Sequence, residues 1–287
     1  MSSLLAADGT RLSYTEVGDG PRLLCLPGGP GRASAYLEEL GGLSRTRTLV
    51  RLDTRATGHS EVPADPASLR FDRLAEDVEA LRAHLHDGDS DGDRVDLLGH
   101  SAGCLVAQAY AAAHPERVRS LVLVTPSDRL QGGDRADTAA IRAARSEEPW
   151  YAEAAEAQAA LVDAAPAQQQ ALVRATRPFF YGRWDAEQQA HAAGADRQSS
   201  KRAELGFGAG FETCDAARIL TALAAVEAPV LVVGGERDAL TGLASVEAVA
   251  ASFPRSRTAV VARAGHFPWV DEPEAFVEVV ASFLATV

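Results

Sequence analysis

A serine stands at the centre of the segment GHSAG at residues 99–103, between an apolar run at 95–98 and a helical stretch. A serine hydroxyl is a weak nucleophile unless a base can reach it, so it must stand clear of its surroundings on a sharp turn. Glycines two places before and after the serine remove the Cβ atoms that would collide in that turn. The helix that follows favours negative charge at its N-terminus. The spacing therefore predicts a strained turn that presents Ser101 as a nucleophile, with a structural role for His100.

Two later loops supply a base and an acid for Ser101. The apolar run at 230–233 leads into Glu236 and Asp238, and the run at 258–261 leads through Ala-Gly to His266. The carboxyl ends of parallel strands meet at one edge of a sheet, so we expect these residues near Ser101. The order serine, acid, histidine fits a nucleophile whose base is oriented by a carboxylate. We predict His266 as the base and Asp238 as the acid, with Glu236 as the alternative acid.

The oxygen of a tetrahedral intermediate needs N–H donors already aimed at it, and removing one donor costs about 10²–10³ in rate. One predicted donor is the backbone N–H of Ala102, the residue after the nucleophile. The other is expected from the loop PGGPG at 27–31, after the apolar run at 23–26. Gly29 is our choice for that donor because it is not a proline and has no side chain to obstruct a substrate.

The elements that must position these residues alternate between strands and helices. Asp8-Gly9 separates two β-like runs and predicts an N-terminal hairpin. Apolar runs predict buried strands at 23–26, 48–52, 95–98 and 121–124, with helices from about Ala33, over 71–84 and over 103–113. Alternation of this kind predicts an α/β fold with a mostly parallel central sheet and helices on both faces.

The pattern changes after Pro126, where residues 127–222 show helical spacing and no convincing strand. We expect a core domain formed by residues 1–126 and 223–287, with 127–222 inserted as a helical cap. The insertion is rich in aromatic residues, which are suited to a pocket wall. The predicted substrate contacts are Gly28, Phe180, Tyr181, Trp184, Glu204, Phe207 and Phe267.

The composition excludes several classes of partner. With 28 Lys and Arg against 40 Asp and Glu, the net charge of −12 argues against binding to nucleic acid or to an anionic membrane. The N-terminus lacks a signal-peptide pattern and no apolar run reaches the length of a membrane span, so we expect a cytoplasmic protein. Three cysteines are too few for a disulfide framework. No dinucleotide, P-loop or zinc-protease motif is present, and the Asp-rich segment 87–92 lacks the later glutamate of a calcium loop. We therefore expect no cofactor and no metal, and nothing in the sequence predicts an oligomeric state.

These motifs together resemble the α/β-hydrolase superfamily and, within it, the proline iminopeptidase branch. The resemblance rests on PGGPG, the segment DTRATGHS at 53–60, GHSAG, Asp238 and AGHFPW at 264–269, and it spans nearly the whole chain. It implies an α/β-hydrolase fold with a helical cap and a serine hydrolase without a cofactor. Pro27, Ala56 and Ala102 depart from the His, Gly and Trp typical of the branch. Those peptidases bind a free amino terminus with cap carboxylates, for which Glu204 and Glu212 lie in a suitable region.

Three hypotheses about function follow. The first is an aminopeptidase like the proline iminopeptidases, acting on a short peptide or another small acyl substrate. The second is a carboxylester or lactone hydrolase, in which water or an internal nucleophile resolves the acyl-enzyme. The third is a ligand-binding protein that keeps the fold and turns over slowly, although every catalytic position is filled.

Overall fold

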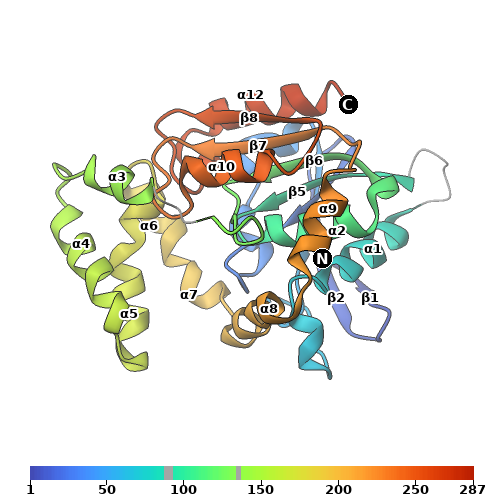
Figure 1. The fold of residues 1–287 in the computed structure, drawn as a ribbon, viewed down its shortest axis with the longest axis horizontal. Helices are drawn as coiled ribbons and strands as arrows, with labels where there is room; N and C mark the ends of the chain where they lie inside the picture. The colour runs from blue at the N-terminus through green and yellow to red at the C-terminus, as the bar shows by residue number, and fades with distance from the viewer. Residues whose placement is uncertain (87–92, 134–136) are drawn as a thin grey trace.

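A computed structural model describes residues 1–86, 93–133 and 137–287 of the chain. Eight strands form one sheet in the order β1-β2-β4-β3-β5-β6-β7-β8 (Figure 1). The strands are β1 (Ser2–Leu5), β2 (Arg11–Val17), β3 (Arg22–Leu26), β4 (Thr48–Asp53), β5 (Val95–His100), β6 (Val118–Val124), β7 (Val230–Gly235) and β8 (Ser256–Val261). The Asp-rich segment 87–92 lies outside the described residues.

The sheet is parallel from β4 to β8, while β1 and β2 join its edge as an antiparallel hairpin. The hairpin turns at Asp8-Gly9, as predicted. After β3 the chain places β4 on one side, and β5 then forms on the other side of β3. Ligands in open α/β sheets bind beyond the carboxyl ends of the strands at such a reversal. The loops after β3 and β5, which carry PGGPG and Ser101, lie at this reversal.

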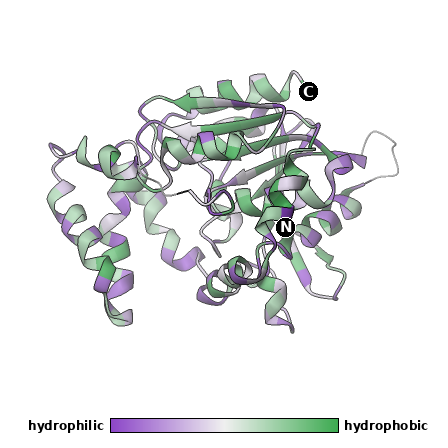
Figure 2. Cartoon of the chain, in the orientation of Figure 1, coloured by the Kyte–Doolittle hydropathy of each residue, from purple (hydrophilic) through white to green (hydrophobic). Residues whose placement is uncertain are grey.

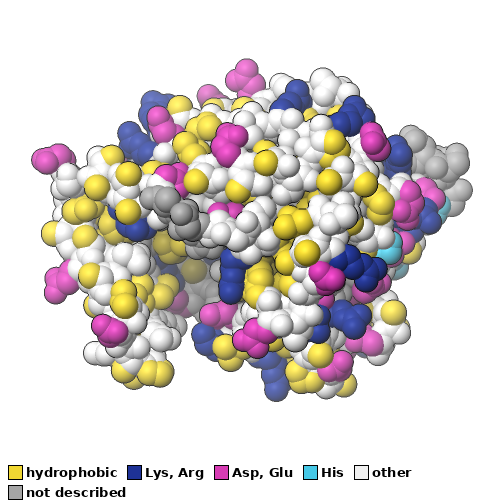
Figure 3. Space-filling view, in the orientation of Figure 1, with side chains coloured by type: hydrophobic (Ala, Val, Ile, Leu, Met, Phe, Trp, Pro, Cys, Tyr) yellow, Lys and Arg dark blue, Asp and Glu magenta, His cyan; other side chains and the backbone are white. Residues whose placement is uncertain are grey.

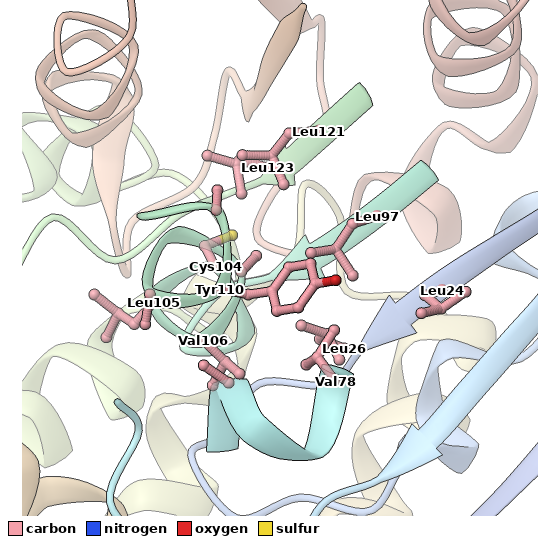
Figure 4. Close-up of a cluster of buried hydrophobic side chains, with 14 of the residues drawn as sticks. Leu24, Leu26, Val78, Leu97, Cys104, Leu105, Val106, Tyr110, Leu121 and Leu123 are labelled. Carbon is pink, nitrogen blue, oxygen red and sulfur yellow. The ribbon is translucent and has the colours of Figure 1, made fainter. Parts of the chain in front are cut away.

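Side chains of the central strands alternate between two buried layers, as the two-residue period of a strand requires. In β3, Leu24 and Leu26 belong to one layer, whereas Leu23 and Cys25 belong to the other. Figure 4 shows part of the first layer, where Leu24, Leu26 and Leu97 lie near Tyr110. The central strands are accordingly mostly hydrophobic in Figure 2, while α4 and α5 mix polar and apolar positions.

Helices cover both faces of the sheet. The first layer is closed by α1 (Leu74–Leu85), α2 (Gly103–Ala113), α9 (Ala216–Leu223) and α10 (Gly242–Ala250). The second is closed by the 3₁₀ turns Ser34–Leu37 and Leu40–Arg45, with α11 (Pro268–Asp271) and α12 (Pro273–Leu284). This arrangement confirms the predicted α/β fold.

The chain between β6 and β7 is helical in its described parts, and its helices gather beside the sheet and along one edge (Figure 1). They are α3 (Thr138–Ala143), α4 (Tyr151–Ala160), α5 (Pro166–Thr176), α6 (Ala186–Ala193), α7 (Ala195–Gln198), α8 (Lys201–Thr213) and α9. Although α9 lies almost wholly within the range 127–222, it packs against α2 of the core. Helix α9 therefore belongs with the core, and α3–α8 form the rest of the described chain between β6 and β7.

The predicted helix from about Ala33 is wrong. Two short 3₁₀ turns occupy this stretch instead. Glu38, Leu40, Gly41 and Gly42 all have positive φ angles, between 48° and 97°. An α-helix cannot continue through residues in that conformation.

Candidate active site

Ser101 stands at the turn between β5 and α2, with its backbone in the left-handed region at φ 54°. Its N–H donates to the Val124 carbonyl at 2.9 Å, which ties the turn to β6. A Cβ on Gly99 would lie 2.8 Å from the Gly103 carbonyl oxygen, and one on Gly103 would lie 2.5 Å from that of Leu26. Both contacts are too short for real Cβ atoms, so the turn requires both glycines.

Asp238 and His266 come from the ends of two neighbouring strands, β7 and β8. His266 Nδ1 lies 2.9 Å from Asp238 Oδ2, and both side chains are buried. Glu236, the alternative acid, is exposed and accepts a hydrogen bond from the Arg263 N–H at 2.7 Å. The structure therefore pairs His266 with Asp238 and places Glu236 elsewhere.

The Asp238 carboxylate is held by donors on both oxygens. Oδ1 accepts from the backbone N–H groups of Leu240 at 2.9 Å and Thr241 at 3.2 Å. Oδ2 accepts from the Thr241 hydroxyl at 2.6 Å as well as facing His266. Burial alone would raise the pKa of Asp238, but the adjacent His266 and these donors outweigh it, and the pKa is lowered. An ionised Asp238 can only accept hydrogen bonds, so His266 donates through Nδ1 and leaves Nε2 to act as an acceptor.

Ser101 and His266 border the same cavity, which has a volume of about 610 Å³. Within the described chain, no hydrogen bond joins Ser101 Oγ to His266. Such bonds are often long before substrate binds and tighten only in the complex. The backbone of His266 is nevertheless fixed, because its N–H donates to the Phe180 carbonyl at 2.7 Å and its carbonyl accepts from Thr125 Oγ1 at 3.0 Å.

His100 supports His266 from behind. Its Nε2 lies 2.9 Å from the His266 carbonyl oxygen, and its Nδ1 lies 2.7 Å from the Tyr36 hydroxyl. The Tyr36 oxygen also accepts from the Gly28 N–H at 2.7 Å, so the tyrosine proton goes to His100, which in turn donates through Nε2. Burial lowers the pKa of His100 well below its ordinary value. A neutral, buried His100 fits the structural role expected from the sequence.

Two backbone N–H groups beside Ser101 have no acceptor anywhere in the described ranges: those of Gly29 and Ala102. The neighbouring N–H groups of Gly28 and Ser101, by contrast, both donate within the protein. Gly28 lies directly against the turn, since a Cβ on it would stand 2.8 Å from Ser101 Cβ and 3.2 Å from the Ala102 nitrogen. The loop after β3 and the turn after β5 thus offer two free donors next to the serine.

Four of the predicted substrate contacts border the cavity: Phe180, Tyr181, Glu204 and Phe267. Helix α5 supplies part of the opposite wall, and the surface in Figure 3 is indented between the lobe of α4 and α5 and the rest of the molecule. The cavity therefore lies between the loops of the sheet and the inserted helices.

The other three predicted contacts, Gly28, Trp184 and Phe207, are not among the described residues that border this cavity. Phe207 packs into the core, with its ring centroid 5.7 Å from that of Phe71. Trp184 packs against Tyr181 at 5.4 Å between ring centroids. Gly28 stands behind Ser101, where it fixes the loop rather than facing the cavity.

Apart from Glu204, the sequence analysis missed the charged residues that border the cavity. Arg32, Arg177, Asp196 and Lys201 all border it. Asp196 pairs with Arg177 at 2.5 Å and with Arg174 at 2.6 Å, and Glu204 pairs with Lys201 at 3.0 Å. The one signal in the sequence was that Arg32 directly follows the PGGPG loop.

Three further observations concern metal ligands, membrane-spanning helices and cysteines. Residues 1–86, 93–133 and 137–287 contain no group of three or more His, Cys, Asp or Glu arranged to hold a metal ion. The same ranges contain no helix with the length and apolar character needed to cross a membrane. Cys25, Cys104 and Cys214 are free thiols.

The curated proteins similar to this chain include a peptidase and an esterase. The chain is 33% identical over 113 residues to a proline iminopeptidase from Heyndrickxia coagulans, a match that spans 39% of this chain and only 38% of that relative's length. It is 27% identical over 277 residues to a pimeloyl-[acyl-carrier protein] methyl ester esterase from Aeromonas hydrophila, covering 95% of this chain and 99% of the relative.

Among solved structures, an esterase from Exiguobacterium antarcticum superposes with a TM-score of 0.73 at 19% identity, covering 99% of each chain. At that identity the likeness shows the fold alone. The sequence model of the protein family described as alpha/beta hydrolase fold matches residues 21–273. This range includes the Ser101 turn, the Asp238–His266 pair and the loop that carries Gly29. The chain therefore belongs to the alpha/beta hydrolase family.

Proposed function

We propose that this protein is a serine hydrolase of carboxylic esters or lactones, with Ser101 as nucleophile, His266 as general base and Asp238 as the group that orients it. The observation that carries the proposal is the buried Asp238–His266 pair at 2.9 Å, bordering the same cavity as Ser101 beside two free backbone N–H groups. A nucleophile, an oriented base and donors for an oxyanion are the parts that acyl transfer needs.

The proposed reaction proceeds through an acyl-enzyme. Ser101 Oγ attacks the carbonyl carbon while His266 Nε2 takes its proton, and the N–H groups of Gly29 and Ala102 stabilise the oxyanion. The carbonyl–oxygen bond to the leaving group breaks as His266 returns the proton to the departing alkoxide. Water then attacks the acyl-enzyme, with His266 again as base, and releases the acid and free Ser101. The proposed steps use only side chains and backbone groups of this chain, and the partner is a small-molecule substrate.

The charges in the cavity favour an ester or lactone over a peptide with a free amino terminus. An ammonium group would need an available carboxylate. Among the described residues, the two carboxylates that border the cavity, Asp196 and Glu204, are already paired with cations. Glu212, the other carboxylate suggested by the sequence, is exposed on α8.

A second candidate is an aminopeptidase similar to the proline iminopeptidases. It is favoured by the partial match at 33% identity and by the PGGPG loop. It requires a substrate ammonium to displace Lys201 from Glu204. That exchange is feasible in energy, because an exposed ion pair of this kind contributes about 0–1 kcal/mol.

We further propose that α3–α8 form a cap over the site. Residues of α5, α6, α7 and α8 border the cavity together with loops of the sheet. An enclosing cap would select substrates by size and keep bulk water from the acyl-enzyme.

The test compares hydrolysis of 4-nitrophenyl acetate and proline 4-nitroanilide by the intact protein, with Ser101→Ala as the blank. We expect release of 4-nitrophenol from the ester that Ser101→Ala lacks, and little release from the anilide. Fast Ser101-dependent cleavage of the anilide would support the aminopeptidase instead. Ester cleavage that survives in Ser101→Ala would contradict the assigned nucleophile.

A further inference from the structure

Arg32 is a buried cation at the edge of the proposed active site. It is only 6% exposed, it directly follows the loop that carries Gly29, and it borders the cavity together with Ser101 and His266. Its backbone is held in place because its N–H donates to the Gly28 carbonyl at 3.2 Å. The position of Arg32 is therefore fixed relative to the free Gly29 N–H group.

All direct partners of the Arg32 guanidinium are neutral. Nε donates to Gln198 Oε1 at 2.9 Å, and Nη2 reaches the His191 carbonyl at 3.4 Å. The guanidinium carbon lies 4.2 Å from the centroid of the Tyr36 ring. In the described part of the chain, no carboxylate lies within ion-pair distance of Arg32 and Nη1 has no hydrogen-bond partner. Nη1 is also absent from the fully enclosed unpaired atoms of these residues, so part of it is accessible, and Arg32 borders the cavity.

Other buried arginines of the chain do have carboxylate partners. Arg55 pairs with Asp77 at 2.6 Å and Arg47 with Asp96 at 2.9 Å, with side-chain exposures of 5% and 12%. Burying an unpaired charge is costly, so such pairing is the usual outcome. Glu38 acts on Arg32 only as a longer-range charge, and burial lowers the pKa of Arg32. Arg32 is therefore a buried cation without a neighbouring anion to balance its charge.

The other charged side chains of the cavity also favour a negatively charged substrate. Asp196 and Glu204 are engaged by Arg177 and Lys201, so the charged side chains among the described residues of the cavity wall comprise three cations and two carboxylates. A substrate with a negative group would complete the balance, whereas a substrate ammonium would add to the excess. Arg presents a planar fork of donors that matches a carboxylate.

We infer that the natural substrate carries a carboxylate, which Arg32 binds, in addition to the ester or lactone carbonyl that Ser101 attacks. This inference rests on the proposed function and narrows its substrate class to half-esters of dicarboxylic acids and to carboxylated lactones. The bond changes remain those of hydrolysis: the acyl–oxygen bond is replaced by a bond to the oxygen of water, and the carboxylate on Arg32 is unchanged. For a half-ester the products are a dicarboxylate and an alcohol.

The experiment compares two esters with the same leaving group. The mono-4-nitrophenyl ester of adipic acid carries a free carboxylate, and 4-nitrophenyl hexanoate is a neutral analogue. For the wild-type protein, we expect kcat/KM to be higher for the adipate ester. In Arg32→Gln, we expect kcat/KM for the adipate ester to fall about 10- to 100-fold, the effect of losing a charge-assisted hydrogen bond, with the hexanoate value within about threefold of wild type.

Arg202→Gln is the matched control, since it makes the same chemical change at an exposed cation of α8 that is not among the described residues bordering the cavity. It should leave the preference for the adipate ester in place. A wild-type protein without that preference, or a preference that survives in Arg32→Gln or disappears in Arg202→Gln, would overturn the inference. If Arg32→Gln hydrolyses neither ester, Arg32→Lys is measured as well. Recovered hydrolysis of the hexanoate ester together with a preference for the adipate ester supports the inference, and any other result contradicts it.

Failure of the proposed function would look different. In that case, neither ester would be hydrolysed in a manner that depends on Ser101. Ser101-dependent hydrolysis of the hexanoate ester without a preference for the adipate ester would leave the hydrolase standing and remove only the role of Arg32.

Discussion

Replacing Asp238 by Asn tests the proposed orientation of His266. The introduced amide would have to replace a carboxylate whose Oδ1 accepts from two backbone N–H groups, those of Leu240 and Thr241. Only the amide oxygen can occupy that place, so the NH₂ group must take the Oδ2 position, 2.9 Å from His266 Nδ1. The Thr241 hydroxyl can rotate to accept from the new NH₂ group. His266 would then accept at Nδ1 and carry its proton on Nε2, where it cannot remove a proton from Ser101.

This wrong tautomer should lower kcat by about 10⁴-fold, or about 5 kcal/mol of transition-state stabilisation, while the fold persists. The assay is hydrolysis of 4-nitrophenyl acetate, with urea unfolding as the check on stability. Glu236→Gln is the matched control, because it makes the same chemical change two residues earlier at an exposed side chain, and it should remain close to wild type. An Asp238→Asn variant within tenfold of wild type, or a larger loss in Glu236→Gln, would refute the reasoning.

Three further predictions concern the groups behind the site. Gly28→Ala places a Cβ 2.6 Å from the His100 carbonyl oxygen and should abolish most esterase activity. Gly208→Ala in α8 is the control, because its Cβ would meet nothing within 4 Å, and it should keep its activity. Equal activity in the two variants would contradict this prediction. Tyr36→Phe leaves the Gly28 N–H and His100 Nδ1 unpaired and should lower the free energy of unfolding by about 1–3 kcal/mol in urea; an unchanged unfolding midpoint would argue against these bonds. Burial lowers the pKa of His191 from 6.5 to about 4, so its contribution is present above pH 6.5 and is lost as pH falls toward 4. The stability of the wild type relative to His191→Gln should therefore fall by up to about 3 kcal/mol over that range, and a difference independent of pH would contradict it.

Much of the architecture could be predicted because most of the sheet is parallel and its central strands are buried on both faces. Its strands read as short apolar runs, and their carboxyl ends carry the loops that hold Ser101, Asp238 and His266. The order of these three along the chain was informative because each follows its own strand. The roles assigned to them remain predictions.

The sequence favoured Asp238 as the acid but left Glu236 open as an alternative. Both follow β7 within three residues, and only the course of the loop decides which carboxylate meets His266. The helix expected from Ala33 failed for a related reason. The backbone takes positive φ angles at Glu38 and Leu40, just before the turn Leu40–Arg45 packs against α12, and no local sequence preference predicts these angles.

The cavity wall was the least predictable part. Phe207 and Trp184 are aromatic residues of the insertion, as are Phe180 and Tyr181, but only the latter two border the cavity. Aromatic composition does not say which face of a helix turns inward toward a substrate. The unpaired state of Arg32 depends on where carboxylates from distant segments lie, which a sequence without a structure does not show.

The most direct test of the central claim is to treat the intact protein with a fluorophosphonate probe and to locate the adduct by peptide mass spectrometry. Fluorophosphonates react with a serine that is activated by a neighbouring base and held beside oxyanion donors. The account predicts one stoichiometric adduct on Ser101, with labelling abolished in Ser101→Ala and strongly slowed in His266→Ala. An unlabelled Ser101, an adduct on another residue, or labelling at the wild-type rate in His266→Ala would contradict it.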